Sequence, residues 1–169
     1  VGSFDYCFGL TNVTVDAANP SFASASGVLF NKTFTTLLQF PIGPVGNYVI
    51  PNSVTNIGGG AFKSCYKLSN VIIPSSVTSI GTSAFAECSS LASMTIPDSV
   101  TSMGDGAFYD CYHLGNVTIG NGLTSISVGV FEACSGLVSV TIPGSVTNIH
   151  DKAFYYCSGV TNTTIGNSV

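Results

Sequence analysis

The residues best suited to chemistry in this 169-residue chain are six cysteines, two histidines and eight acidic residues. Five of the cysteines recur every 23 residues, from Cys65 to Cys157, and the sixth is Cys7. Cysteines in a regular series can form disulfides, hold a metal ion or serve as small buried apolar side chains. The choice among these depends on the elements that position them.

Other side chains return with the same period, which indicates a repeat architecture. A phenylalanine stands three residues before each of the five cysteines, and a leucine or valine stands three residues after it. Because each unit must fill an equivalent place in the stack, we expect the phenylalanines and cysteines to form one continuous structural core. These core pairs are Phe62 with Cys65, Phe85 with Cys88, Phe108 with Cys111, Phe131 with Cys134, and Phe154 with Cys157.

Each unit is predicted to contain a short strand followed by turns. Val71, Ile72 and Ile73 form a run typical of a strand, and Pro74 ends it. The three-residue spacing of phenylalanine, cysteine and leucine favours a helical or 3-10 turn. One unit of 23 residues cannot bury enough apolar surface to offset its loss of conformational entropy, so stacked neighbours must supply the rest.

We interpret the cysteine series as buried thiols rather than disulfides or metal ligands. Equivalent residues of stacked units lie at least ~4.8 Å apart with parallel side chains. A disulfide needs Cβ atoms ~3.5–4.5 Å apart that point toward each other. The spacing of 23 matches no zinc pattern, and no paired histidines accompany it. We therefore predict no metal site and no cofactor.

The string IPSSVTSIGTSAFAECSSL, from Ile73 to Leu91, resembles the BspA-like leucine-rich repeat family of surface proteins. The spacing of Leu68, Val71 and Ile73 also resembles a leucine-rich repeat, with Ser76 where asparagine is usual. The resemblance implies a fold class: a curved leucine-rich-repeat solenoid of short parallel strands, with turns and short 3-10 or helical segments. It also implies an extracellular or cell-surface location and a role in adhesion or partner binding, and it carries over no catalytic residue.

The period predicts a single solenoid domain over residues 1–169 in three parts. Residues 1–15 match part of a repeat, residues 50–169 hold five regular repeats, and residues 16–49 depart from the period. Within the irregular part, two strand-like runs flank Asn31, Lys32 and Thr33, which predicts a β-hairpin. A degenerate repeat without a task is the alternative interpretation.

Composition and charge exclude several classes of function. Apolar residues make up 45% of the chain, but no apolar run approaches the ~20 residues of a membrane-spanning helix, so no membrane insertion is expected. Four lysines, no arginine and a net charge of −4 provide no basic surface for nucleic acid. His113 and His150 fall in expected turns without a nucleophile and base beside them, so we predict no catalytic residue and no enzyme.

Two exposed surfaces remain as candidates for binding. The side chains that alternate with the buried residues of each strand form a neutral polar array, made of Asn70, Ser93, Thr95, Asn116, Thr118, Ser139 and Thr141. The outer turn carries tyrosines, namely Tyr66, Tyr109, Tyr112, Tyr155 and Tyr156. Exposed tyrosines favour recognition because they give a large contact area at low entropic cost. The alternative is that tyrosine is simply tolerated near the surface.

The leading hypothesis is an extracellular binding scaffold for a protein or glycan partner. An alternative is a structural component that self-associates into a fibre or surface layer. This alternative is based on two features of the sequence: both ends of the chain fall within a repeat, and neither end resembles a polar cap. On that view the chain belongs to a longer array of repeats or associates end to end. A remote alternative is ice binding by the outward threonines.

Overall fold

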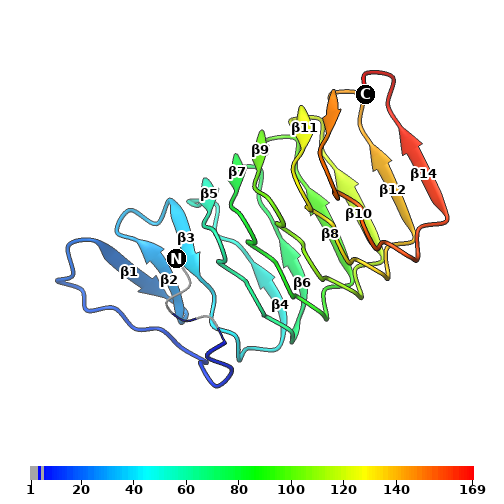
Figure 1. Ribbon diagram of the computed structural model, residues 1–169. Coiled ribbons are helices and arrows are strands. Elements are labelled where there is room, and N and C mark those ends of the chain that lie inside the picture. Colours follow the sequence, from blue (N-terminus) through cyan, green and yellow to red (C-terminus); the bar gives the residue numbers. More distant parts are fainter. Residues whose placement is uncertain (1–3, 5) are drawn as a thin grey trace.

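The computed structural model describes residues 4 and 6–169, which form a solenoid of stacked units with parallel strands (Figure 1). This confirms the solenoid predicted from the repeat. Each regular unit contributes one longer strand, one strand of two residues and a turn. The described residues contain no helix, and hence none that is long and apolar enough to cross a membrane.

The longer strands lie side by side and form what we call the long-strand face. Residues at equivalent positions of the repeat are in register, so that Asn116 pairs with Ser93 on one side and with Ser139 on the other. Every hydrogen-bonded pair of these strands is parallel, as expected for strands joined by one full turn of a solenoid. They form two ladders, one of β4 (Gly46–Val49) and β6 (Leu68–Ile72), and one of β8 (Ser93–Ile96), β10 (Asn116–Ile119), β12 (Ser139–Ile142) and β14 (Asn162–Ile165).

The two-residue strands stack in a second row. They are β5 (Asn56–Ile57), β7 (Ser79–Ile80), β9 (Ser102–Met103), β11 (Ser125–Ile126) and β13 (Asn148–Ile149). This row continues toward the N-terminus into three longer strands, β3 (Thr36–Gln39), β2 (Val28–Asn31) and β1 (Phe22–Ala25), in the order β1-β2-β3-β5-β7-β9. β3 is parallel to β5, whereas β2 and β1 are antiparallel to their neighbours. The expected hairpin region therefore contains two hairpins, which extend one row of strands and not the other.

The segment around each core phenylalanine departs from the expectation of a helical or 3-10 turn. The N–H of Cys88 donates back to Phe85 O (3.3 Å), but the N–H of Phe85 donates to Ala107 O in the next unit (2.7 Å). Alternate N–H groups thus bond to the neighbouring unit, which a helix would not allow. Left-handed residues two positions after the phenylalanine make this possible: Ser64, Glu87, Asp110, Ala133 and Tyr156. We call this series of turns the turn edge.

Stacked phenylalanine rings run through the centre of the solenoid. Phe62, Phe85, Phe108 and Phe131 are fully buried, while Phe154 in the last unit is half-buried. Neighbouring rings are nearly parallel, with an interplanar angle of 1° between Phe85 and Phe108. The centroid distances from Phe62 to Phe154 are 4.8, 5.1, 5.5 and 5.4 Å in turn. One repeated aromatic position therefore builds a continuous core.

The cysteines next to these rings are free thiols. The thiol of Cys88 donates to Phe62 O and that of Cys111 to Phe85 O, both at 3.1 Å, so each thiol contacts a backbone carbonyl of the preceding unit. Cys134 and Cys157 repeat this contact with Phe108 O and Phe131 O. Burial raises the pKa of the Cys65 thiol from 9.0 to about 12, which keeps it neutral and unreactive.

Replacing Phe108 by alanine should lower the free energy of unfolding by about 3–5 kcal/mol, because it leaves a cavity between two stacked rings. Tyr109→Ala is the matched control, since Tyr109 is the adjacent residue and is 41% exposed. Denaturant unfolding followed by circular dichroism provides the comparison. Equal losses for the two variants would contradict the central role of the ring stack.

The buried thiols should make stability fall at high pH. Because burial raises the pKa of Cys65 from 9.0 to about 12, the folded state retains a proton that the unfolded chain releases above pH 9.0. The contribution is complete below pH 9.0 and is lost as the pH rises toward 12, by roughly 1.4 kcal/mol per pH unit for each such thiol. Urea unfolding in the presence of a reductant, between pH 8 and 10.5, measures the slope. Cys65→Ala should reduce it, and an unchanged slope would show that other groups set the pH dependence.

Candidate functional site

The polar array predicted on the strands lies on the outer side of the long-strand face. Ser93, Thr95, Asn116, Thr118 and Thr141 are exposed. The remaining two members of the array, Asn70 and Ser139, are half-buried. The parallel register places equivalent residues of neighbouring units directly opposite each other. Two straight columns result, one of asparagine and serine and one of threonine, with a spacing of about 4.8 Å along each.

The threonine column does not continue to the N-terminal end of the long-strand face. There the equivalent positions are Ile72 and Val49, which are 52% and 61% exposed. The threonine column is therefore confined to β8 to β14, and apolar side chains take its place in β4 and β6, where the neighbouring column stays polar at Asn47 and Asn70. The uncharged polar part offers hydroxyl and amide groups but no titratable group.

The predicted tyrosines lie along the turn edge. Tyr109 and Tyr112 are 41% and 43% exposed, and Tyr155 and Tyr156 are 48% and 69% exposed. Tyr66 is half-buried and packs partly against the core. The rings of Tyr155 and Tyr156 contact each other at 4.3 Å between centroids. The turn edge thus presents aromatic side chains both near its middle and near β14.

Two further aromatic residues were not included in the sequence prediction. Tyr6 and Phe8 are each 54% exposed, and Phe8 lies between the rings of Tyr6 (6.0 Å) and Tyr66 (6.1 Å). Phe8 follows Cys7 as Tyr66 follows Cys65, so the alignment of the partial N-terminal repeat contained the signal. We call the full set the aromatic edge: Tyr6, Phe8, Tyr66, Tyr109, Tyr112, Tyr155 and Tyr156.

Lysine side chains accompany the aromatic edge. Lys63, Lys67 and Lys152 lie over the rings of Tyr6, Tyr66 and Tyr155, at 5.1, 5.5 and 5.8 Å from the centroids. Such cation–π contacts stabilise exposed rings by about 0.5–1 kcal/mol each. Three of the four lysines of the chain are therefore on this edge.

Acidic groups occupy the middle of the turn edge. Ser64 Oγ donates to Glu87 Oε2 at 2.7 Å. Partial burial and the charge of Glu87 raise the pKa of Asp110. Within residues 4 and 6–169, histidine, cysteine and acidic side chains do not form a group of three that could hold a metal ion. His113 is exposed, and its Nδ1 lies 2.7 Å from Ser89 O.

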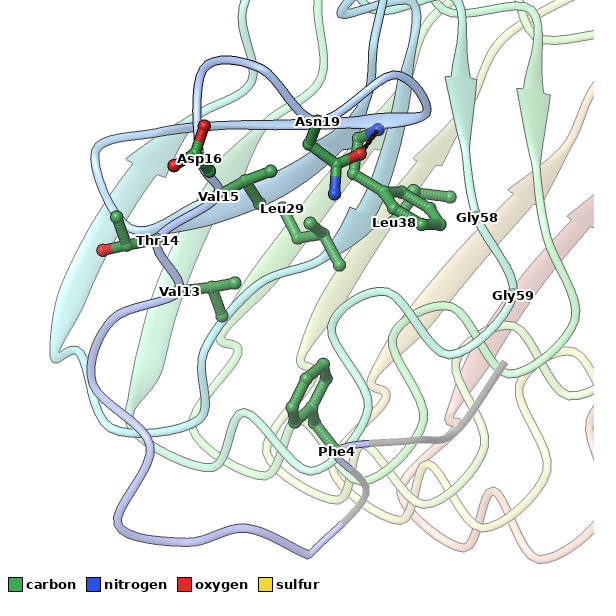
Figure 2. A pocket seen from close by; sticks show the side chains of 11 residues that line it. Phe4, Val13, Thr14, Val15, Asp16, Asn19, Leu29, Leu38, Gly58 and Gly59 are labelled. Atoms are coloured by element: carbon green, nitrogen blue, oxygen red, sulfur yellow. Dashed lines mark hydrogen bonds between the residues drawn. The ribbon is translucent and has the colours of Figure 1, made fainter.

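An apolar pocket of about 680 Å³ lies at the N-terminal end and was not anticipated from the sequence. Leu29 and Leu38 point outward from β2 and β3, and Val13, Val15 and Phe4 face them across the pocket (Figure 2). Alternation along the two strands, with Phe30 and Leu37 buried, contained the signal for these outward leucines.

Polar side chains around the pocket are engaged locally. Asp16 Oδ1 accepts the N–H of Ala18 (2.8 Å), and Asn19 Oδ1 accepts the N–H groups of Ser21 and Phe22 (2.9 Å each). A specific ligand pocket needs a few convergent polar groups that fix orientation. This pocket therefore supplies mainly apolar contact.

The stacked units, parallel strands and buried phenylalanine series define a leucine-rich repeat solenoid. The chain belongs to the family described as the BspA type leucine rich repeat region, whose model matches residues 42–161 in six copies. This confirms the family resemblance found in the repeat. Leucine-rich repeat solenoids are typically non-enzymatic scaffolds.

Three solved structures illustrate the similarity. A leucine-rich repeat protein from Eubacterium ventriosum is 24% identical with a TM-score of 0.88, and the match covers 93% of this chain and 43% of that one. A leucine rich cell surface protein from Faecalibacterium prausnitzii is 26% identical with a TM-score of 0.63, covering 98% and 44%. The pneumococcal vaccine antigen PcpA is 21% identical with a TM-score of 0.59, covering 92% and 50%.

The chain thus spans less than half the length of the first two structures it matches. No curated protein matches it.

Proposed function

We propose that this chain is a binding scaffold on a cell surface or outside the cell, and that the aromatic edge is its contact surface for a protein or glycan partner. The observation that carries the proposal is the series of exposed aromatic side chains on one edge of a rigid stack. Tyrosine rings have few rotatable bonds, so that little entropy is lost when they bind a partner.

The backbone beneath the aromatic edge supports this role. Tyr109 directly follows a core phenylalanine, and its turn bonds to both neighbouring units: the N–H of Glu87 donates to Tyr109 O (2.7 Å), and the N–H of Phe108 donates to Val130 O (2.8 Å). The ring of Tyr109 is therefore attached to a backbone that is fixed on both sides, and Tyr155 O accepts the N–H of Ala133 (2.8 Å) from the preceding unit. Preorganised aromatic groups bind with a smaller ordering penalty than groups on a mobile loop.

The surface location is supported by the relatives. One similar structure is described as a leucine rich cell surface protein and another as a vaccine antigen. The matches cover less than half of the first two relatives. The binding role is therefore proposed for this chain, and the activity and partners of a longer protein that contains it are proposals as well.

Two alternatives have less support. End-to-end self-association requires both rows of strands to continue into a second copy, but β3 already pairs with the antiparallel β2, which ends the regular row. Ice binding requires a long, continuous array of outward threonines, and the column is short because Val49 and Ile72 take the equivalent positions in β4 and β6.

Replacing Tyr109 and Tyr112 together by serine should weaken partner binding at least tenfold, because buried tyrosines at interfaces commonly contribute about 2 kcal/mol or more. Both side chains are more than two-fifths exposed, so the fold should persist. The measurement is binding to a glycan array and to proteins extracted from host-cell surfaces, with circular dichroism as a check on folding.

The matched control removes a pair of side chains from the long-strand face, Thr95 and Thr118, by substitution with alanine. This variant should bind like the unmodified protein. If the threonine variant loses binding and the tyrosine variant does not, the contact surface is the polar array and not the aromatic edge.

A further inference from the structure

One edge of the long-strand face is open at β4, in the interior of the chain. β4 pairs with β6 on one side, and no strand of the described residues pairs with its other side. Of the described residues that precede β4, β1, β2 and β3 join the row of short strands instead, and Leu10 contacts the chain only before β4 begins, where the N–H of Gly43 donates to Leu10 O at 2.8 Å. In Figure 1, β4 is the last member of its row on the N-terminal side.

The backbone groups of β4 show which of them face the open side. The N–H of Ile50 donates to Ile72 O at 3.1 Å, toward β6. Because N–H and C=O groups alternate in direction along a strand, those of Asn47 and Val49 point away from β6. In a regular unit, the backbone groups that point in this direction bond to the preceding unit, as when the N–H of Gly120 donates to Ile96 O (2.9 Å). Among residues 4 and 6–169, no strand takes this preceding position beside β4.

Side chains at the open edge indicate missing cover on both faces. Val45, which directly precedes β4, is 77% exposed, and Val49 on the outer face is 61% exposed. On the inner face, Tyr48 is half-buried, although its counterparts Val71 and Met94 are 3% and 2% exposed. An added strand would shield apolar groups on either side of β4 as well as supply backbone hydrogen bonds.

The space beside β4 admits one strand but not a second solenoid. A second copy stacked end to end would need to pair with both rows of strands at once. The row of short strands is closed at this end, since β3 pairs with β2 and β2 with β1 in antiparallel hairpins. The occupant that fits is therefore a single extended segment.

Charge at this end favours an acidic partner. Residues 41–80, which contain β4 and β6, include Lys63 and Lys67 and no acidic residue, although the whole chain carries a net charge of −4. Lys67 lies near the start of β4 on its β6 side, because its carbonyl accepts the N–H of Gly46 at 3.1 Å. In a strand parallel to β4, the N-terminal flank would lie at this end.

We propose that the open edge of β4 binds an extended peptide segment by β-strand addition, in parallel orientation, with apolar residues alternating along it and acidic residues at its N-terminal flank. Recognition of this kind takes its affinity from main-chain hydrogen bonds and its selectivity from the alternate side chains. Lys63 and Lys67 also lie over rings of the aromatic edge, but the backbone contact proposed here is made by β4 alone and does not depend on the proposed function.

The probe is a fluorescein-labelled peptide with the sequence of residues 114–120, a regular strand of this chain, preceded by two aspartates. Ile119 occupies the position in the repeat that Ile50 occupies in β4, and the N–H of Ile50 points to the next strand of the row. In the bound peptide, the amides copied from Ile119 and from Val117, two residues earlier, should therefore point to β4. N-methylation of these two amides should weaken binding at least about tenfold, measured by fluorescence anisotropy. N-methylation of the two amides copied from Asn116 and Thr118 should change it by less than about twofold. Replacing the aspartates by lysines should weaken binding about fivefold.

A change in the protein tests the same contact. Val49→Pro removes an N–H that faces the open side and breaks no bond to β6, so the strand should persist while peptide binding falls at least about tenfold. The double serine variant of Tyr109 and Tyr112 should bind the peptide normally, which separates this inference from the proposed function.

Three results would overturn the proposal. The first is absence of binding by the aspartate-flanked peptide, and the second is equal weakening by both patterns of N-methylation. The third is a wild-type dimer in sedimentation that Val49→Pro converts to a monomer, which would make the occupant a second copy of this chain.

Discussion

The fold depends on hydrogen bonds that join the backbone of each unit to the units before and after it. Along the short strands, a later unit donates to an earlier one, as when Gly104 N–H bonds to Ile80 O at 2.9 Å. Along the turn edge the direction is reversed, as when Phe85 N–H bonds to Ala107 O. Each unit therefore satisfies its polar backbone groups only when it has neighbours, and a buried group without a partner would be strongly destabilising. This constraint explains why the same side chains return at the same positions.

The core follows from this arrangement. Stacked units place equivalent side chains directly above one another, so that a phenylalanine at one position becomes a continuous row of rings. The neighbouring cysteine is small enough to fit beside the ring, and its thiol donates to a carbonyl of the preceding unit. Phe85 O illustrates the result, since it accepts both the N–H of Cys88 and the thiol of Cys111. The cysteines thus act as buried hydrogen-bond donors, and this role explains their regular spacing; the explanation requires neither disulfides nor a metal ion.

Functional variation is left to positions that the stack does not use. Tyr109 and Tyr155 follow core phenylalanines and Tyr112 follows a core cysteine, and all three are exposed. The hairpins at the N-terminal end are the other variation. By extending only one row of strands, they cover the end of the short strands and leave β4 without a neighbour. A regular array thus acquires two distinct surfaces, an aromatic edge and an open strand.

The sequence alone determined the features that follow from periodicity. The spacing of 23 residues specified the units, the buried phenylalanines and thiols, and the outward direction of Asn116 and Thr118, because stacked equivalents must share one environment. It also contained the signal for Phe8, which a complete alignment of residues 1–15 would have found.

Tertiary structure decided what periodicity does not control. The three-residue spacing around Phe85 is compatible with a helix, and only the bonds to the next unit, with Glu87 in a left-handed conformation, exclude it. The pocket beside Leu29 and the open edge of β4 also depend on which row the hairpins join. That choice rests on contacts between residues far apart in the chain, which a local pattern does not encode.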